Sequence, residues 1–324
     1  MSEQAHDTSH IIQSLLSNVA LSAVKFAAAF YTGSGALLAE ALHTATDSLN
    51  QILLLIGVRA SNKKPDATHP LGYGRELYFW SFLVALLLFS AGGLFSIYEG
   101  VHKLSEPAAI DHAWVGFAIF AFSLVLEIVV TRANIEQINA KRGERGFLQF
   151  VQDSKESDLI VVFGENAAAL LGTIFAFAAF TITWKTGDGR WDAAGSILVG
   201  IVLIGVAVFL TWEVKSLLIG ERADKEISAA VRDAAIEDPL VNDVLELITV
   251  QQGPGEVLVA LKVTCSPSLG ASELSRMINA FEARVRKRVP QAKWIFVEPD
   301  LSGVPSVRYE AEPAATEAPP ESRT

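Results

Sequence analysis

The residues best suited to bind a metal ion lie in one apolar stretch of the sequence, LLAEALHTATDSLNQILLL. His43 and Asp47 are four residues apart, so a helix brings them to one face, with Asn50 and Gln51 one turn further on. An imidazole nitrogen and a carboxylate on one face supply half of a tetrahedral zinc site. In a soluble helix this spacing is usually a surface pair. Here apolar residues flank it on both sides, and the motif predicts a buried metal site.

A second apolar stretch, DLIVVFGENAAALLGTIFAFAAF, can complete that site. Glu165 follows Gly164 and precedes small residues that let another helix approach closely. It can supply the carboxylate oxygen that the first half-site lacks. The alternative is a carboxylate hydrogen-bonded to a neighbouring helix. Asn166 is a weaker candidate, because an amide oxygen binds zinc poorly and a buried Asn also ties helices together.

Other polar groups have simpler explanations. Asp66 and His69, in the segment KKPDATHPLGYGRE, could form a weak accessory metal site, and a turn rich in Gly and Pro explains the segment equally well. Lys25 and Glu127 lie in apolar stretches, where a Lys–Glu pair or snorkelling accounts for them without chemistry.

Composition indicates a membrane protein. The chain has 324 residues, of which 51% are hydrophobic and 19% charged. Its net charge of -10 disfavours nucleic acid as a partner, since a nucleic-acid-binding surface needs the opposite sign. Cys265 is the single cysteine, which excludes an intrachain disulfide and a thiolate-rich zinc site. Oxygen and nitrogen ligands must hold any metal.

The elements that position these residues are six apolar segments long enough to cross a bilayer. They lie at residues 10–32, 36–60, 76–102, 112–134, 158–184 and 191–218. Lys and Arg concentrate in the loops at 61–75 and 135–157 and in their flanks, so the positive-inside rule places these loops and both termini in the cytoplasm. Residues 1–9 are then a cytoplasmic tail, and residues 10–219 form an all-α six-helix transmembrane bundle.

A small cytoplasmic domain is expected at residues 220–304. A helical pattern is followed by two strand-like runs around Gly253-Pro254-Gly255, a second amphipathic helix and a last strand. The order α-β-β-α-β predicts an α+β sandwich with helices on one face of a three-stranded sheet. Residues 305–324, rich in proline and acidic residues, are expected to be disordered.

The chain resembles the cation diffusion facilitator family of divalent-metal transporters. The resemblance rests on LLAEALHTATDSLNQ, PDATHPLGYGRELYFW, DAAGSILVGIVLI and SLLIGERAD, and it extends from about residue 10 to residue 300. It implies a homodimer with a cytoplasmic ferredoxin-like domain. The implied activity is export of zinc or a related divalent ion in exchange for protons by alternating access.

The same resemblance implies roles for individual residues. His43 and Asp47 fall on the second-helix pair of the family's transport site. The fifth helix departs from the usual His/Asp pair and resembles the branch with a Glu-Asp dipeptide, with Glu165 at the Glu and Asn166 at the Asp. The third and fourth ligands are therefore left open. No histidine follows His112, so the resemblance favours dimerisation over histidine-bound regulatory metal for the soluble domain.

Proton coupling follows from the ligand types, because metal binding requires neutral imidazole and ionised carboxylate. Zinc is expected first and Mn²⁺ last, with Fe²⁺, Co²⁺, Ni²⁺ and Cd²⁺ between them, and no cofactor is bound permanently. The expected location is a bacterial inner membrane. The alternative function is a membrane-anchored metal sensor or scaffold without transport. An enzyme is disfavoured, because the sequence contains no HExxH motif.

Overall fold

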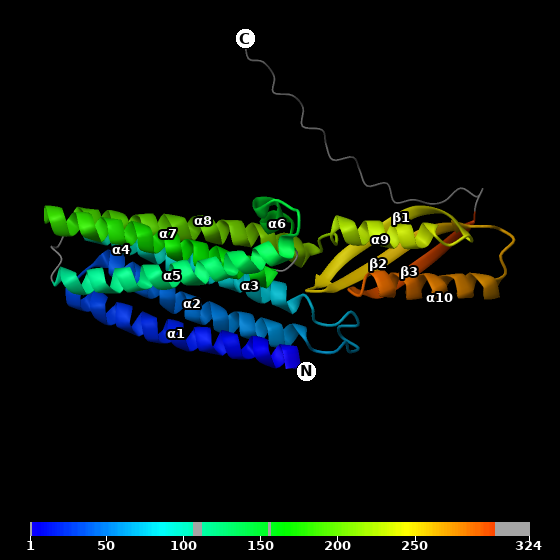
Figure 1. Ribbon diagram of the computed structural model, residues 1–324, viewed down its shortest axis with the longest axis horizontal. Coiled ribbons are helices and arrows are strands. Elements are labelled where there is room, and N and C mark those ends of the chain that lie inside the picture. The colour runs from blue at the N-terminus through cyan, green and yellow to red at the C-terminus, as the bar shows by residue number, and fades with distance from the viewer. Residues whose placement is uncertain (1, 106–111, 155–156, 302–324) are drawn as a thin grey trace, which may run out of the picture. The chain divides into compact units, whose positions relative to one another are not determined.

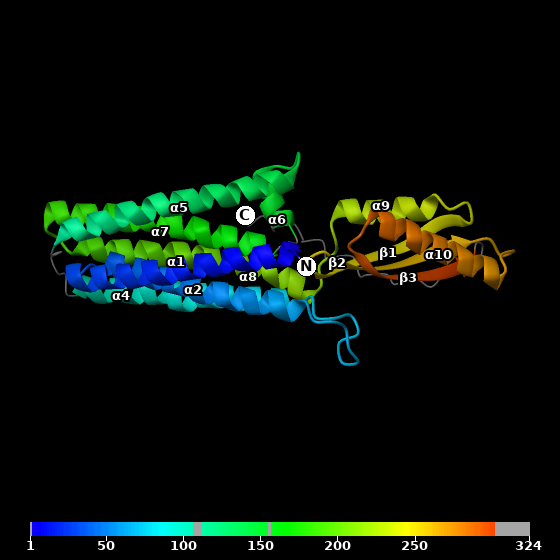
Figure 2. The ribbon, with the colours of Figure 1, turned by 60° about the horizontal axis from the view of Figure 1, so that its bottom comes forward.

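The computed structural model describes residues 2–105, 112–154 and 157–301. The chain divides into two compact units, Met1–Lys225 with Thr249–Leu258, and Glu226–Ile248 with Val259–Thr324. Long helices lie side by side as a bundle in the first unit (Figures 1 and 2). The tail predicted at residues 305–324 lies outside the described residues.

Six long helical rods make up the bundle within the described part of the chain. Four of them are long and apolar enough to span a membrane: Glu76–Ser105, Ala113–Arg142, Leu159–Thr186 and Arg190–Ile219. α2 is less apolar because it carries the polar residues of the predicted metal site. The bounds are α1 (Ser2–Thr32), α2 (Gly35–Ser61), α3 (Glu76–Leu87) continuing through the π-helical η1 (Leu88–Leu94) into α4 (Phe95–Ser105), α5 (Ala113–Arg142), α7 (Ser157–Thr186) and α8 (Arg190–Ile219).

Two differences from the predicted elements concern ends and loops. α1 begins at Ser2, so residues 2–9, expected as a tail, continue the helix. A short helix, α6 (Phe147–Asp153), lies in the loop expected at 135–157. The segment FLQFVQD is too short for its apolar spacing to distinguish a helix from a loop.

Glycines bring α8 into backbone contact with η1 and α4. A Cβ atom at Gly200 would lie 2.6 Å from Ile97 Cγ1 and 2.7 Å from the carbonyl oxygen of Gly93. A Cβ atom at Gly100 would lie 2.8 Å from the carbonyl oxygen of Ala193. Small residues permit this close approach, as is usual where membrane helices pack.

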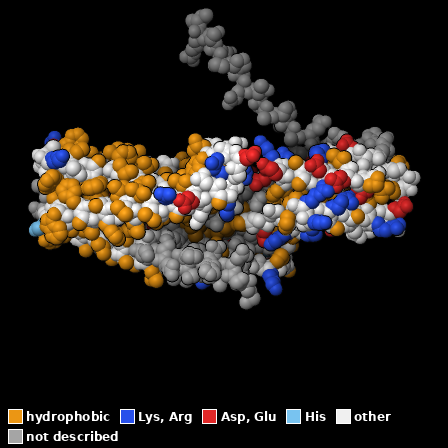
Figure 3. Space-filling view, in the orientation of Figure 1, with side chains coloured by type: hydrophobic (Ala, Val, Ile, Leu, Met, Phe, Trp, Pro, Cys, Tyr) orange, Lys and Arg blue, Asp and Glu red, His pale blue; other side chains and the backbone are white. Residues whose placement is uncertain are grey.

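The outer surface of the bundle is apolar. Hydrophobic side chains cover the face of it shown in Figure 3, whereas Lys, Arg, Asp and Glu gather over the other unit. Trp114 is 71% exposed, Trp212 is 76% exposed, and Phe122, Val125 and Val129 of α5 are also exposed. So large an apolar surface is unfavourable in water and suits lipid.

The C-terminal domain has the predicted order of elements. It comprises α9 (Lys225–Ile236), β1 (Val241–Gly253), β2 (Glu256–Cys265), α10 (Ala271–Arg288) and β3 (Ala292–Leu301), and the sheet order is β1-β2-β3. Alternate residues of β2, from Val257 to Cys265, are buried. Arg284 of α10 pairs with Asp238 at 2.8 Å, and Cys265 Sγ lies 3.8 Å from Met277 Sδ. The expected helical bundle followed by a domain with the order α-β-β-α-β is confirmed.

Candidate metal site

The N-terminus of α2 is fixed by a carboxylate from α8. Asp192 is 3% exposed and accepts hydrogen bonds from the Ser34 hydroxyl at 2.6 Å and from the backbone N–H groups of Gly35 and Ala36. Ser34 Oγ in turn caps the helix by accepting from Leu37 N at 3.1 Å. A buried anion at a helix N-terminus satisfies free N–H groups and opposes the helix dipole. This arrangement fixes the start of the helix that carries His43 and Asp47.

His43 and Asp47 form a buried pair on α2. The distance from His43 Nδ1 to Asp47 Oδ1 is 3.4 Å, and their side chains are 1% and 16% exposed. Neither ring nitrogen of His43 nor Asp47 Oδ1 has a hydrogen-bond partner within the described part of the chain. Zinc bonds of about 2.0–2.2 Å at a tetrahedral angle separate two ligand atoms by roughly 3.3–3.5 Å. The pair therefore has the spacing of one edge of a zinc tetrahedron.

Glu165 of α7 contacts α2 at Asn50. It is 7% exposed, and its Oε1 accepts a hydrogen bond from the amide of Asn50, which is fully buried. Glu165 also lies within electrostatic range of Asp47. Among the described residues, no three His, Cys, Asp or Glu side chains are close enough to hold one metal ion. The structure thus places Glu165 near the His43–Asp47 pair, but the three side chains do not converge on one metal position. The hydrogen bond from Asn50 to Glu165 is also the contact expected if Glu165 only ties the two helices together.

Asn166 is placed differently from its neighbour. The contact described for it is through its backbone carbonyl, which accepts a hydrogen bond from Thr131 Oγ1 at 3.4 Å. Consecutive helical residues point about 100° apart, so Asn166 cannot face α2 as directly as Glu165 does. A ligand role for Asn166 stays a prediction.

The segment with Asp66 and His69 forms a hydrogen-bonded turn. Asp66 Oδ1 accepts from the backbone N–H groups of Thr68 at 2.9 Å and His69 at 2.8 Å, and Oδ2 accepts from the Tyr73 hydroxyl at 2.7 Å. The Tyr73 hydroxyl, then the His69 N–H, lower the pKa of Asp66 below its usual range. His69 Nδ1 lies 3.8 Å from Asp66 Oδ1, and both side chains are half exposed. This geometry agrees with the turn interpretation, and the accessory metal role stays a prediction.

Glu40 is a buried carboxylate that the sequence did not single out, as is Asp192. Glu40 lies three residues before His43, in the same apolar stretch, and this position is the signal that could have identified it. Lys25 Nζ lies 3.2 Å from Glu40 Oε2 and 3.4 Å from Glu127 Oε1. The Lys–Glu pairing predicted for Lys25 and Glu127 is confirmed, with Glu40 as a further member.

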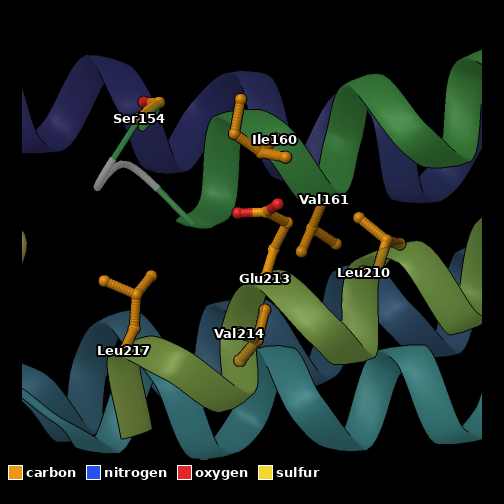
Figure 4. A pocket seen from close by; sticks show the side chains of 7 residues that line it. All are labelled: Ser154, Ile160, Val161, Leu210, Glu213, Val214 and Leu217. Atoms are coloured by element: carbon orange, nitrogen blue, oxygen red, sulfur yellow. The ribbon is translucent and has the colours of Figure 1, made fainter. Parts of the chain in front are cut away.

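A small cavity lies between α7 and α8, away from these groups. Its volume is about 10 Å³, roughly what one water molecule needs. Figure 4 shows Glu213 among mostly aliphatic side chains at this cavity. His43, Asp47 and Glu165 do not line it, so it is not part of the candidate site. The lining residues are Ser154, Ile160, Val161, Leu210, Glu213, Val214 and Leu217.

Known proteins resemble this chain over most of its length. The mitochondrial "Proton-coupled zinc antiporter SLC30A9" of Homo sapiens is 31% identical over 235 residues, which are 72% of this chain and 41% of the relative. The protein of the same name from Xenopus laevis is 32% identical over 72% of this chain and 42% of its own length. The chain thus spans about two fifths of the length of these relatives.

A bacterial relative matches over more of both chains. The "Cation-efflux pump FieF" of Pectobacterium atrosepticum is 23% identical over 87% of this chain and 89% of its own length. A solved structure of the MamM CTD is 16% identical over 24% of this chain and 93% of its own length, with a TM-score of 0.23. Residues 11–219 match the family described as "Cation efflux transmembrane domain". Since this match covers the helical bundle, the chain belongs to the cation efflux family, and the resemblance to cation diffusion facilitators is confirmed.

Proposed function

We propose that the protein exports a divalent metal ion, zinc first, from the cytoplasm in exchange for protons. The observation that carries this proposal is the buried pair of His43 and Asp47, whose 3.4 Å spacing fits one edge of a zinc tetrahedron. Glu165 would supply the third ligand by exchanging its contact with Asn50 of α2 for the metal ion. The fourth would come from Asn166 or from water. Closing and opening of this ligand set between α2 and α7 would accompany alternating access.

The ligand types support proton exchange. Metal binds the neutral imidazole and the ionised carboxylates, so protons and the metal ion compete for the same groups. The relatives named "Proton-coupled zinc antiporter SLC30A9" support both zinc and proton coupling. Fe²⁺, Co²⁺, Ni²⁺, Cd²⁺ and Mn²⁺ are further cargo candidates, because ligand affinity alone does not select zinc.

The proposed setting is a multi-pass homodimer with both termini in the cytoplasm, argued from the basic loops and from the family. A bacterial inner membrane stays a prediction, because relatives are named both as mitochondrial proteins and as a bacterial pump.

Zinc uptake into proteoliposomes, with and without an imposed pH gradient, tests the proposal. Asp47→Asn keeps the side-chain volume and removes the charge, so we expect it to abolish zinc flux. Asp188→Asn, at an exposed carboxylate between α7 and α8, is the matched control and should transport normally. Wild-type flux from Asp47→Asn would remove this pair from the site. No flux from the wild-type protein would instead favour the membrane-anchored sensor or scaffold.

A further inference from the structure

Lys25 of α1 is the centre of a buried polar cluster apart from the candidate metal ligands. Its side chain is 1% exposed, and Nζ donates hydrogen bonds to Glu40 Oε2 at 3.2 Å, Thr44 Oγ1 at 3.0 Å and Glu127 Oε1 at 3.4 Å. Thr173 Oγ1 of α7 also donates to Glu40 Oε2, at 2.7 Å. The cluster therefore joins α1, α2, α5 and α7.

The charges in this cluster do not balance. One ammonium group faces two carboxylates, so the fully ionised cluster carries one uncompensated negative charge in the bundle interior. Glu40 Oε1 and Glu127 Oε2 have no hydrogen-bond partner among the described residues, although Glu40 is fully buried and Glu127 is 12% exposed. An unpaired buried charge is costly, whereas one proton on either carboxylate makes the cluster neutral.

The oxygen of Glu40 that lacks a hydrogen-bond partner among the described residues lies beside α7. Oε1 lies 2.9 Å from the position that a Cβ atom on Gly172 of α7 would occupy, and the two methyl groups of Val199 lie 3.6 Å and 4.0 Å from that same position. A tether between α1 and α2 needs only the Lys25–Glu40 pair. Glu127, the second carboxylate, adds a negative charge that such a tether does not require.

We propose that Glu40 and Glu127 form a proton-binding site, separate from the metal ligands, that carries a proton exchanged for the metal ion. This inference rests on the proposed proton-coupled export. Glu40, Thr44 and Asp47 share one face of α2, and seven residues separate Glu40 from Asp47 by about 10 Å. Lys25 and Glu127 both lie within electrostatic range of Asp47.

Coupling between the two sites would then be electrostatic. A divalent ion beside Asp47 repels a proton on the Glu40–Glu127 pair, and proton binding to the pair weakens metal binding in return. The charged groups that face Glu127 are Lys25 from α1 and Glu40 from α2, with Asp47 farther off. α7 presents the Thr173 hydroxyl there, and its carboxylate Glu165 lies about two turns away.

The test is the number of protons moved per zinc ion in proteoliposomes that hold a zinc dye and a pH dye. Glu127→Gln removes the titrating group and keeps its shape. We expect its proton-to-zinc ratio to fall by about one proton per zinc ion. The dependence of its zinc flux on the pH gradient should flatten, and its zinc affinity should vary less with pH than that of the wild-type protein.

Two variants on the same helix serve as controls. Glu127→Asp keeps a carboxylate and should restore the wild-type ratio. Glu136→Gln changes an exposed carboxylate of α5, paired with Arg132 at 3.0 Å, and should leave the ratio unchanged. Should Glu127→Gln fail to fold, Glu40→Gln decides by the same ratio.

The outcomes separate this inference from the proposed function. An unchanged ratio in Glu127→Gln overturns the proton site and leaves proton-coupled export standing. Zinc and proton fluxes that fall together at constant ratio identify the cluster as a tether, which also overturns it. A wild-type protein that moves zinc without protons, or no zinc at all, overturns the proposed function and the inference together.

Discussion

A carboxylate that already accepts a hydrogen bond keeps further lone pairs for a metal ion, or can exchange the hydrogen bond for the ion. Glu165 is in this position, because Asn50 donates to its Oε1, while the Oδ1 of Asn50 has no partner among the described residues. This hydrogen bond holds Glu165 against α2, the helix that carries His43 and Asp47. Recruitment of Glu165 as a ligand would require only a local exchange of this contact.

Removal of the Glu165 charge should therefore weaken metal binding more than it weakens folding. Glu165→Gln can still accept a hydrogen bond from Asn50, so the fold should persist. We expect zinc affinity, measured by dye competition in detergent, to fall at least tenfold, about 1.4 kcal/mol. Normal transport by Glu165→Gln with a dead Asp158→Asn would shift the α7 ligand two turns toward the N-terminus of that helix. The side chain of Asp158 lies outside the described residues.

The Asp66 turn gives a pH dependence with a definite sign. Hydrogen bonds from Tyr73 and His69 favour the ionised carboxylate and lower the pKa of Asp66. A group with a lowered pKa stabilises the folded turn above its unfolded pKa, and this stabilisation is lost as the pH falls through the folded pKa. Tyr73→Phe should raise the pKa of Asp66 toward its usual value. Carbon NMR titration of labelled aspartate measures this, and an unchanged pKa would show that the Tyr73 hydroxyl is not the main cause.

Close packing between α8 and the η1–α4 rod depends on single glycines. At Gly200 an added Cβ would meet the Gly93 carbonyl oxygen at 2.7 Å and the backbone nitrogen of Ile97 at 2.9 Å, and neither atom can move without the helix. At Gly205, on the same helix, an added Cβ meets nothing within 4 Å. The two positions therefore offer matched substitutions with opposite packing consequences.

We expect Gly200→Ala to destabilise the bundle by roughly 1–3 kcal/mol, the usual effect of overpacking. Gly205→Ala should be neutral or slightly stabilising, because alanine favours the helix. Thermal unfolding of both variants in the same detergent gives the comparison. Equal unfolding temperatures would mean that the two rods can separate at little cost.

The C-terminal domain is expected to hold two protomers together without metal. The chain has no histidine after His112, so the domain lacks the usual nitrogen ligands for a strong site. Residues 220–304 expressed alone should sediment as a dimer at high protein concentration, with or without chelator. A dimer that forms only after zinc addition would contradict this prediction.

Helix bounds were predictable where a long apolar run determines them. The segment expected at 36–60 is α2 (Gly35–Ser61), and that expected at 191–218 is α8 (Arg190–Ile219). Contacts between helices were less predictable, because periodicity identifies the buried face of a helix and not the helix that packs against it. The roles of Glu40 and Asp192 depend on which helices are adjacent, and one sequence does not contain that information. His43 and Asp47 were predictable because their spacing along a single helix brings them together.

The single buried cysteine has a practical consequence for measuring motion. Cys265 lies against Met277 in the soluble domain, and burial, with a smaller contribution from Asp238, raises the pKa of its thiol. The thiolate is the form that reacts with maleimides and spin labels, so this thiol should stay largely silent at neutral pH. A cysteine introduced at an exposed position would then be the dominant label on each chain. Distances between such spin labels, measured by pulsed electron paramagnetic resonance, could follow the helices through a transport cycle without first removing the native thiol.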